Sequence, residues 1–223
     1  MAYFSLTYLQ SLMEDADRKR SENTLSNPTE VDTQITYLPF KLKLYWPGCI
    51  DSPYYHWKAH TYQLKESKSL RKGTLHYHRI LRKDGKILKI ETYVHSILDS
   101  ALLMYYEENK RYAFSHPNAR SSCANLTQVL TYEDGHVTED YMIRGNQIVY
   151  RQYMHMDGEK YQYYDINYIP SSSLPINWIR IGTITTGVNS KREIDYLWPQ
   201  SIEANEEGTI CQLPELDPGI IEA

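Results

Sequence analysis

Turn dipeptides recur at nearly even intervals between residues 126 and 169, and this spacing constrains the fold more than any other feature of the chain. Asp134-Gly135, Gly145-Asn146 and Asp157-Gly158 separate four short runs, LTQVLTYE, HVTEDYMIR, QIVYRQYMH and KYQYYDINYI. Such dipeptides are preferred in tight β-hairpin turns because glycine and asparagine tolerate a positive φ. The four runs are therefore predicted to be strands of an antiparallel meander.

Side-chain alternation and tyrosine content support the same prediction. In the second run, Val137, Tyr141 and Ile143 fall on one face of the predicted strand, while Thr138 and Asp140 fall on the other. The chain has 21 tyrosines and only 3 phenylalanines. A tyrosine ring packs well on a pleated sheet while its hydroxyl still needs water or a hydrogen-bond partner.

Further strands are predicted on both sides of this region. They are residues 35–46, 55–64, 74–82, 86–97, 101–106, 111–115, 177–185 and 192–198. Asp84-Gly85 is predicted to turn between 74–82 and 86–97. Segment 97–110 fits either part of a hairpin or a helix. Residues 3–19 form an amphipathic pattern that predicts one helix, with Leu6, Leu9 and Met13 near one face.

The chain is therefore predicted to be mainly β, an antiparallel meander of about ten to twelve strands with a short N-terminal helix. A barrel or a strongly curved sheet is favoured because a long flat meander would expose two unpaired edges; a β-sandwich is the alternative. The predicted division is an N-terminal helix and polar linker (1–34), a single antiparallel β domain (35–198) and an acidic C-terminal arm (199–223) without periodicity.

Charge is distributed unevenly along the chain. Residues 58–89 contain ten basic and two acidic residues, whereas residues 193–223 contain eight acidic residues and no lysine or arginine. The basic segment also carries aromatic rings, a mixture that binds anions, although lysine-rich sheet edges are common. Nucleic acid is not expected as a partner. The hypothesis for the arm is that residues 203–223 fold back on the basic hairpin and cover it.

Cysteine spacing and the absence of a long apolar run predict a cytoplasmic protein without a membrane span. Cys49, Cys123 and Cys211 are odd in number and far apart, so neither a disulfide framework nor a structural zinc site is expected. No apolar run approaches the ~18–20 residues that a membrane span requires. Residues 1–20 lack the basic region and apolar stretch of a secretory signal.

Four side chains on the 74–97 hairpin are the candidate metal ligands. His76 and His78 point to one side of a strand, and Glu91 or His95 on the paired strand could complete a site for a single divalent metal. If Asp84-Gly85 is a two-residue turn, opposed positions sum to 169, so His78 faces Glu91. No other cofactor is predicted, and the chain has no nucleophile motif or glycine-rich phosphate loop, so no catalytic residue is assigned.

Three hypotheses for function follow. The first is a non-enzymatic binding protein whose concave Tyr- and Trp-lined face holds a small amphipathic or anionic ligand. Its candidate ligand contacts are Tyr62, Tyr77, Arg79, Tyr150, Arg151 and Tyr153. The second is a protein-interaction module, an inhibitor or adaptor, that uses exposed Tyr and Trp and the acidic arm. The third is a metal-dependent enzyme that acts through His76 and His78.

Residues 112–122 (YAFSHPNARSS) resemble a Pro-Asn-Leu-Arg stretch of the lipocalin-like phycobiliprotein lyases. The resemblance covers eleven residues, Ala119 stands where that stretch has a leucine, and no other signature of that family is found in the chain. What the resemblance implies is a lipocalin-like barrel.

Overall fold

The computed structural model describes residues 2–23, 28, 30–40, 47–116, 125–172, 176–187, 191–197 and 209–213. The helices are α1 (Leu6–Glu22), the short 3-10 helix η1 (Pro47–Cys49) and α2 (Pro53–Thr61). The strands are β1 (Ala2–Ser5), β2 (Gln34–Pro39), β3 (Tyr77–Lys83), β4 (Lys86–Val94), β5 (Ile97–Tyr106), β6 (Lys110–Ser115), β7 (Leu126–Glu133), β8 (His136–Arg144), β9 (Gln147–His155), β10 (Lys160–Tyr168), β11 (Ile176–Thr185), β12 (Lys191–Leu197) and β13 (Thr209–Leu213).

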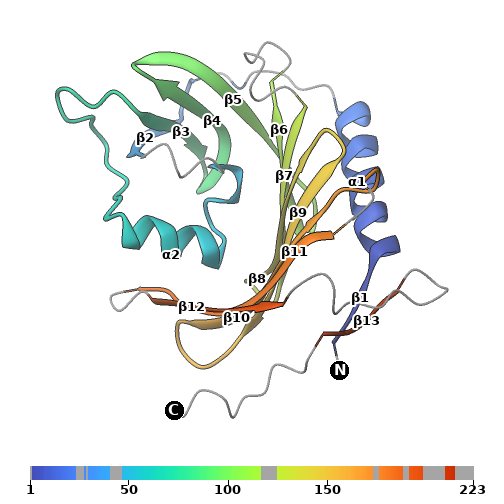
Figure 1. Ribbon diagram of the computed structural model, residues 1–223. Helices are drawn as coiled ribbons and strands as arrows, with labels where there is room; N and C mark the ends of the chain where they lie inside the picture. Colours follow the sequence, from blue (N-terminus) through green and yellow to red (C-terminus); the bar gives the residue numbers. More distant parts are fainter. Residues whose placement is uncertain are drawn as a thin grey trace.

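Strands β2 to β12 form one antiparallel sheet in which every strand lies beside its neighbours in the chain. The sheet has eleven strands and is strongly curved, but its edge strands β2 and β12 do not pair with each other, so it is not closed (Figure 1). The prediction of a mainly β chain with a strongly curved meander is confirmed. No helix in the described part of the chain has the length and apolar character that crossing a membrane requires.

Tight turns set the register of this meander where the sequence predicted them. Asp84 and Gly85 have φ values of 50° and 79°, and Asp134 and Gly135 have φ values of 49° and 80°. Two successive residues in the left-handed region match the twist of the flanking strands. Each pair therefore joins its two strands as a two-residue turn.

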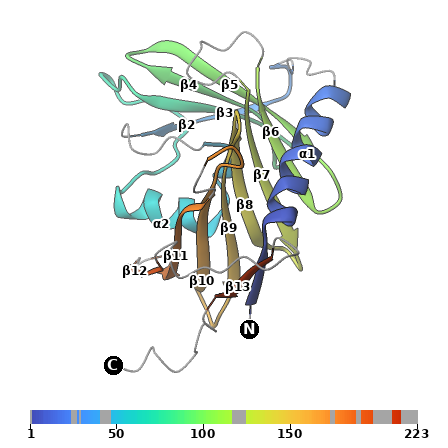
Figure 2. The same cartoon turned by 45° about the vertical axis from the view of Figure 1, so that its right-hand side comes forward.

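The two main helices cover opposite faces of the sheet (Figures 1 and 2). Leu9, Leu12 and Ala16 of α1 pack against a cluster that includes Tyr141 and Ile166, and all five side chains are buried. We call this face of the sheet the outer face. Tyr54 of α2 packs with η1 against side chains of the other face, which we call the inner face.

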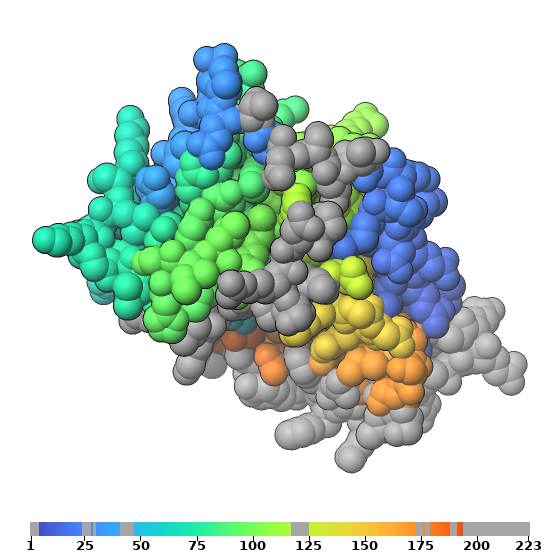
Figure 3. Space-filling view, turned by 90° about the horizontal axis from the view of Figure 1, so that it is seen from above, coloured from blue at the N-terminus to red at the C-terminus, as the bar shows by residue number. Residues whose placement is uncertain are grey.

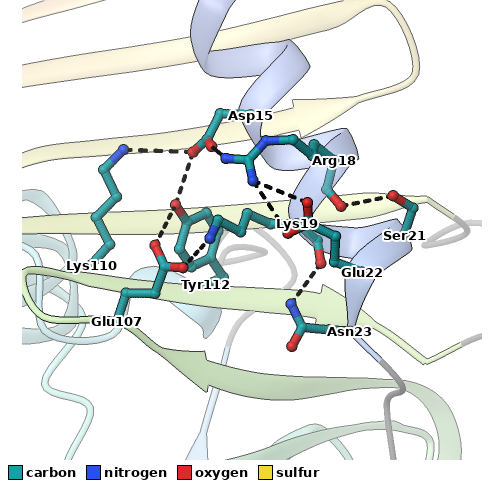
Figure 4. Close-up of polar contacts among 9 residues, drawn as sticks. All are labelled: Asp15, Arg18, Lys19, Ser21, Glu22, Asn23, Glu107, Lys110 and Tyr112. Atoms are coloured by element: carbon teal, nitrogen blue, oxygen red, sulfur yellow. Dashed lines mark hydrogen bonds and ion pairs between the residues drawn. The ribbon is translucent and has the colours of Figure 1, made fainter.

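Helix α1 is also fixed to the sheet by polar contacts near its C-terminal half (Figure 4). Tyr112 donates a hydrogen bond of 2.9 Å to Asp15 Oδ2, and Lys110 lies 3.6 Å from the same oxygen. Lys19 pairs with Glu107 in the turn before β6. Burial opposes ionisation of Asp15, but the bond from Tyr112 and the charges of Lys110 and Arg18 outweigh it and lower its pKa. These contacts fix how far along the sheet α1 lies.

Several predicted elements differ from the structure. Residues 55–64 are not a strand, because Pro53–Thr61 form α2, where Ser52 accepts a hydrogen bond from Tyr55 N at 3.2 Å and Pro53 takes the first turn. Segment 97–110 is strand β5 and the turn to β6, not a helix. The N-terminal helix is confirmed, although it begins at Leu6 and is preceded by β1. Positions 41–46 of the predicted first strand lie outside the described residues.

The C-terminal arm contains a strand that was not predicted. Residues 209–213 form β13, which pairs antiparallel with β1 near the N-terminus (Figure 2). The hypothesis that the arm covers the basic hairpin is therefore wrong for these residues, because their strand partner is β1 and not β3 or β4. The rest of the arm lies outside the residues that the structure describes.

Candidate anion site on the inner face

A row of four charged side chains crosses the inner face of the sheet, and we call it the charge row. Asp140 on β8 lies opposite Arg151 on β9, and Arg151 lies opposite Asp165 on β10. Asp165 in turn lies opposite Arg180 on β11. Directly opposed side chains of neighbouring strands are about 5 Å apart and point to the same face, so the charges alternate in sign across four strands.

At the β8 end the charge row is fully buried and closely bonded. Arg151 Nη1 donates a hydrogen bond of 2.9 Å to Asp140 Oδ1, and the hydroxyl of Tyr153 donates one of 2.6 Å to Asp140 Oδ2. Asp140 is 0% exposed. Burial and the nearby carboxylate raise the pKa of the Tyr153 phenol well above its ordinary value, so the phenol remains a proton donor. Each carboxylate oxygen of Asp140 thus accepts a hydrogen bond from a buried side chain of β9.

At the β11 end the contacts are looser. Asp165 lies 3.5 Å from Arg151 Nε, 3.6 Å from Arg180 Nη1 and 4.0 Å from Arg192 Nη2 of β12. The side chain of Asp165 is 2% exposed, whereas that of Arg180 is 30% exposed. With Arg192 included, the group holds three guanidinium groups and two carboxylates, a net charge of +1. Of these five side chains, that of Arg180 at the β11 end is the most exposed.

Aromatic rings of α2 and β10 line the same end. The guanidinium of Arg151 lies 3.9 Å from the centre of the Tyr54 ring. That of Arg192 lies 5.1 Å from the Trp57 ring and 5.5 Å from the Tyr163 ring, whose hydroxyl accepts a 2.5 Å hydrogen bond from Arg192 Nε. Cations over ring faces are stabilised by the ring quadrupole. The site thus combines guanidinium donors with flat apolar surface.

Two glycines allow this packing. A Cβ atom on Gly48 of η1 would lie 2.8 Å from the Cβ atoms of both Ala113 and Gln128, so η1 approaches the sheet only because residue 48 has no side chain. Gly182 of β11 lies opposite Tyr163, and a Cβ there would come within 2.8 Å of the ring. Arg111 also holds this segment by pairing with Asp51 and donating to the Gly48 carbonyl at 3.0 Å.

Comparisons with other proteins add no assignment at this point. The chain matches no protein-family model, no curated protein and no solved structure. The chemistry of the inner face therefore rests on its own residues.

The residues predicted to contact a ligand are not brought together. Arg151 and Tyr153 lie in or beside the charge row, but Tyr150 points to the outer face, where it donates to Glu139 at 2.6 Å. Tyr62 is the C-cap of α2. Tyr77 and Arg79 lie on β3, where Tyr77 stacks on Tyr93 with ring centres 4.8 Å apart and Arg79 binds Glu91.

Sequence reasoning missed most of the charge row and its aromatic cover. The residues it missed are Tyr54, Trp57, Asp140, Asp165, Arg180 and Arg192. One signal was present, because a two-residue turn at Gly145-Asn146 makes opposed positions sum to 291 and places Asp140 opposite Arg151. Trp57 was missed because residues 55–64 are predicted to be a strand, whereas Pro53–Thr61 form α2.

The predicted metal site does not assemble as proposed. A register shift between Leu81 and Arg82 makes opposed positions sum to 170, so His78 faces Thr92, with 3.1 Å between Nδ1 and Oγ1. Glu91 instead faces Arg79 and binds both Arg79 and Lys89 at 2.8 Å. The rings of His76 and His95 pack edge to face, with their centres 4.7 Å apart. Among the described residues, no group of three or more His, Cys, Asp or Glu side chains could hold a metal ion.

Cys49 lies beneath α2 and offers a test of this packing. It is 1% exposed, and burial raises the pKa of its thiol well above the ordinary value. Because the thiolate is the reactive form, in a variant with Cys123→Ser and Cys211→Ser the remaining thiol should react with DTNB at pH 8 roughly a hundredfold more slowly than in concentrated guanidinium chloride. Release of thionitrobenzoate measures both rates. Equal rates would contradict the packing of η1 and α2 on the sheet.

Proposed function

We propose that this chain is a non-enzymatic binding protein and that the Arg180–Arg192 end of the charge row holds a small anionic ligand with an aromatic or aliphatic body. The observation that carries the proposal is the clustering of three guanidinium groups, those of Arg151, Arg180 and Arg192, within 4.0 Å of the Asp165 carboxylate at the partly exposed end of the charge row. A carboxylate, sulfonate or phosphate group suits such a cluster because a guanidinium group donates two parallel hydrogen bonds to two oxygens of one anionic group.

The aromatic side chains specify the rest of the ligand. Trp57 and Tyr163 flank Arg192, so an anion bound there would have its apolar body against ring faces. Ligand sites commonly combine mostly apolar walls with a few polar groups that fix orientation. An amphipathic anion therefore fits better than a small inorganic ion, which would use only the guanidinium groups.

A fluorescent amphipathic anion, 8-anilinonaphthalene-1-sulfonate, tests the proposal. It should bind the folded protein at low salt with increased fluorescence, and Arg180→Gln should weaken the affinity about tenfold, the loss expected for one charge-assisted hydrogen bond. Arg144→Gln is the matched control, since Arg144 is exposed at the end of β8 and lies outside the charge row. Fluorescence titration gives each Kd, and near-ultraviolet circular dichroism confirms that each variant keeps its packing.

Three outcomes decide the proposal. Weaker binding in Arg180→Gln with unchanged binding in Arg144→Gln supports it. Equal Kd values in the wild type and in Arg180→Gln would place the probe elsewhere and overturn it, as would a wild type that binds no probe. If the probe binds as expected, native mass spectrometry of the protein from its own host would identify a retained anion by its mass.

A further inference from the structure

The end of the sheet formed by β3, β4 and β5 carries exposed aliphatic side chains that the proposed ligand site does not use. Leu75 is 49% exposed, Ile97 is 55% exposed and Leu98 is 45% exposed. Large exposed apolar groups that gather in one place mark surfaces that contact another body. We call these three side chains, together with Tyr77 and Tyr93, the apolar tip.

Register places most of the apolar tip on one face. Tyr77 lies opposite Tyr93, and Tyr93 lies opposite Leu98, so these three side chains form a row across the strands. Leu75 precedes Tyr77 by two positions, and its carbonyl accepts a hydrogen bond of 2.9 Å from Ser96 N. This bond places Leu75 beside the turn that joins β4 to β5. The aliphatic groups therefore lie at the extremity, and the stacked tyrosines lie just behind them.

A tight two-residue turn joins β4 to β5 at this end of the sheet. Val94 lies opposite Ile97, and the two residues between them, His95 and Ser96, have φ values of 50° and 60°. Residues other than glycine rarely occupy this left-handed region, and two in succession form a tight two-residue hairpin turn. The turn places Ile97 at the end of the β4–β5 hairpin, where its side chain is 55% exposed.

Basic residues accompany the apolar tip. Arg71 and Lys72 are exposed in the turn just before Leu75, where Thr74 N donates to the Arg71 carbonyl at 3.1 Å. Lys65 and Lys68 are exposed in the same loop. From Ser67 to Lys83 the chain contains no aspartate or glutamate. In the space-filling view this loop, in turquoise, projects at the end of the molecule away from α1 (Figure 3).

We propose that the apolar tip docks on a bilayer of anionic phospholipid. Aliphatic side chains at the extremity would enter the boundary of the acyl chains, tyrosines would lie at headgroup level, and the lysine and arginine side chains would meet the negative surface charge. The exposed lysine and arginine side chains beside the apolar tip are the observation that favours an anionic bilayer as its partner. Binding of this kind is peripheral and reversible.

Vesicle co-sedimentation of the full chain tests this docking. Wild type should bind vesicles of phosphatidylcholine and phosphatidylserine (7:3) and bind pure phosphatidylcholine much more weakly. Leu75→Ser combined with Ile97→Ser and Leu98→Ser, and separately Arg71→Glu combined with Lys72→Glu, should each lower the partition coefficient about tenfold or more.

Matched controls are available elsewhere on the surface. Lys83→Glu with Lys86→Glu reverses two exposed charges at the other end of the same hairpin, and Met154→Ser removes an apolar side chain that is 51% exposed on β9. Both controls should bind anionic vesicles as the wild type does.

Each remaining outcome would overturn the proposal. These outcomes are a wild type that does not bind anionic vesicles, tip variants that bind as the wild type does, and control variants that lose binding to the same extent. A self-association that the triple serine variant abolishes in sedimentation velocity, without vesicle binding by the wild type, would instead assign the apolar tip to a contact between copies of the chain.

Discussion

Asp140→Asn is expected to lower the free energy of unfolding by about 3 kcal/mol, because it removes one partner of a buried ion pair and leaves the other partner charged. Asp140 is 0% exposed and accepts from both Arg151 and Tyr153. Desolvation opposes the charge of Arg151, and the carboxylates of Asp140 and Asp165 stabilise it and raise its pKa. Of the two carboxylates that lie near it, Arg151 would then keep the more distant one, Asp165 at 3.5 Å from Nε.

Urea unfolding at pH 7 measures this loss, and a double variant separates charge from packing. Asp140→Leu combined with Arg151→Met replaces the pair with apolar groups, which often costs much less than breaking it. The double variant should therefore be more stable than Asp140→Asn. Glu133→Gln, an exposed position at the end of β7, should change stability by less than about 0.5 kcal/mol. A single variant as stable as the wild type would contradict the bonding at the β8 end of the charge row.

Turn chemistry explains why so much of the fold could be predicted from the sequence. Asp84-Gly85 and Asp134-Gly135 adopt the positive φ values that make two-residue turns, so the hairpins that they join follow from local residues. The α2 segment could not be predicted in the same way. Its tyrosines and tryptophan have high β propensity, yet the Ser52-Pro53 helix start and packing against the sheet outweigh that propensity.

The candidate site depends on register over longer connections, which local chemistry does not set. The two-residue turn at Gly145-Asn146 fixes Asp140 opposite Arg151, but residues 169–175 join β10 to β11, and no dipeptide there determines that Asp165 faces Arg180. The predicted metal site failed for a related reason. One irregular position between Leu81 and Arg82 shifts by one residue every pair of that hairpin that lies farther from the Asp84-Gly85 turn.

Leu9→Ala in α1 is expected to destabilise the protein by about 3 kcal/mol, within the range measured for buried leucines. Leu9 is 0% exposed and packs among outer-face residues of several strands, including Tyr150 and Ile148. A cavity there would remove contacts from a helix whose other buried side chains are Leu12 and Ala16. Because most of the stability of a helix in a protein comes from the packing of its apolar face, the order of α1 depends on these contacts.

The same substitution at an exposed site is the control. Leu75→Ala removes the same atoms from a side chain that is 49% exposed, so it should cost less than about 1 kcal/mol in urea unfolding. Native-state hydrogen exchange adds a local readout, since Leu9→Ala should speed exchange in α1 more than in β8 and β9 if the helix opens before the sheet. Equal costs for the two substitutions would show that α1 contributes little to the core, and the outer face would then need another cover for Tyr141 and Ile166.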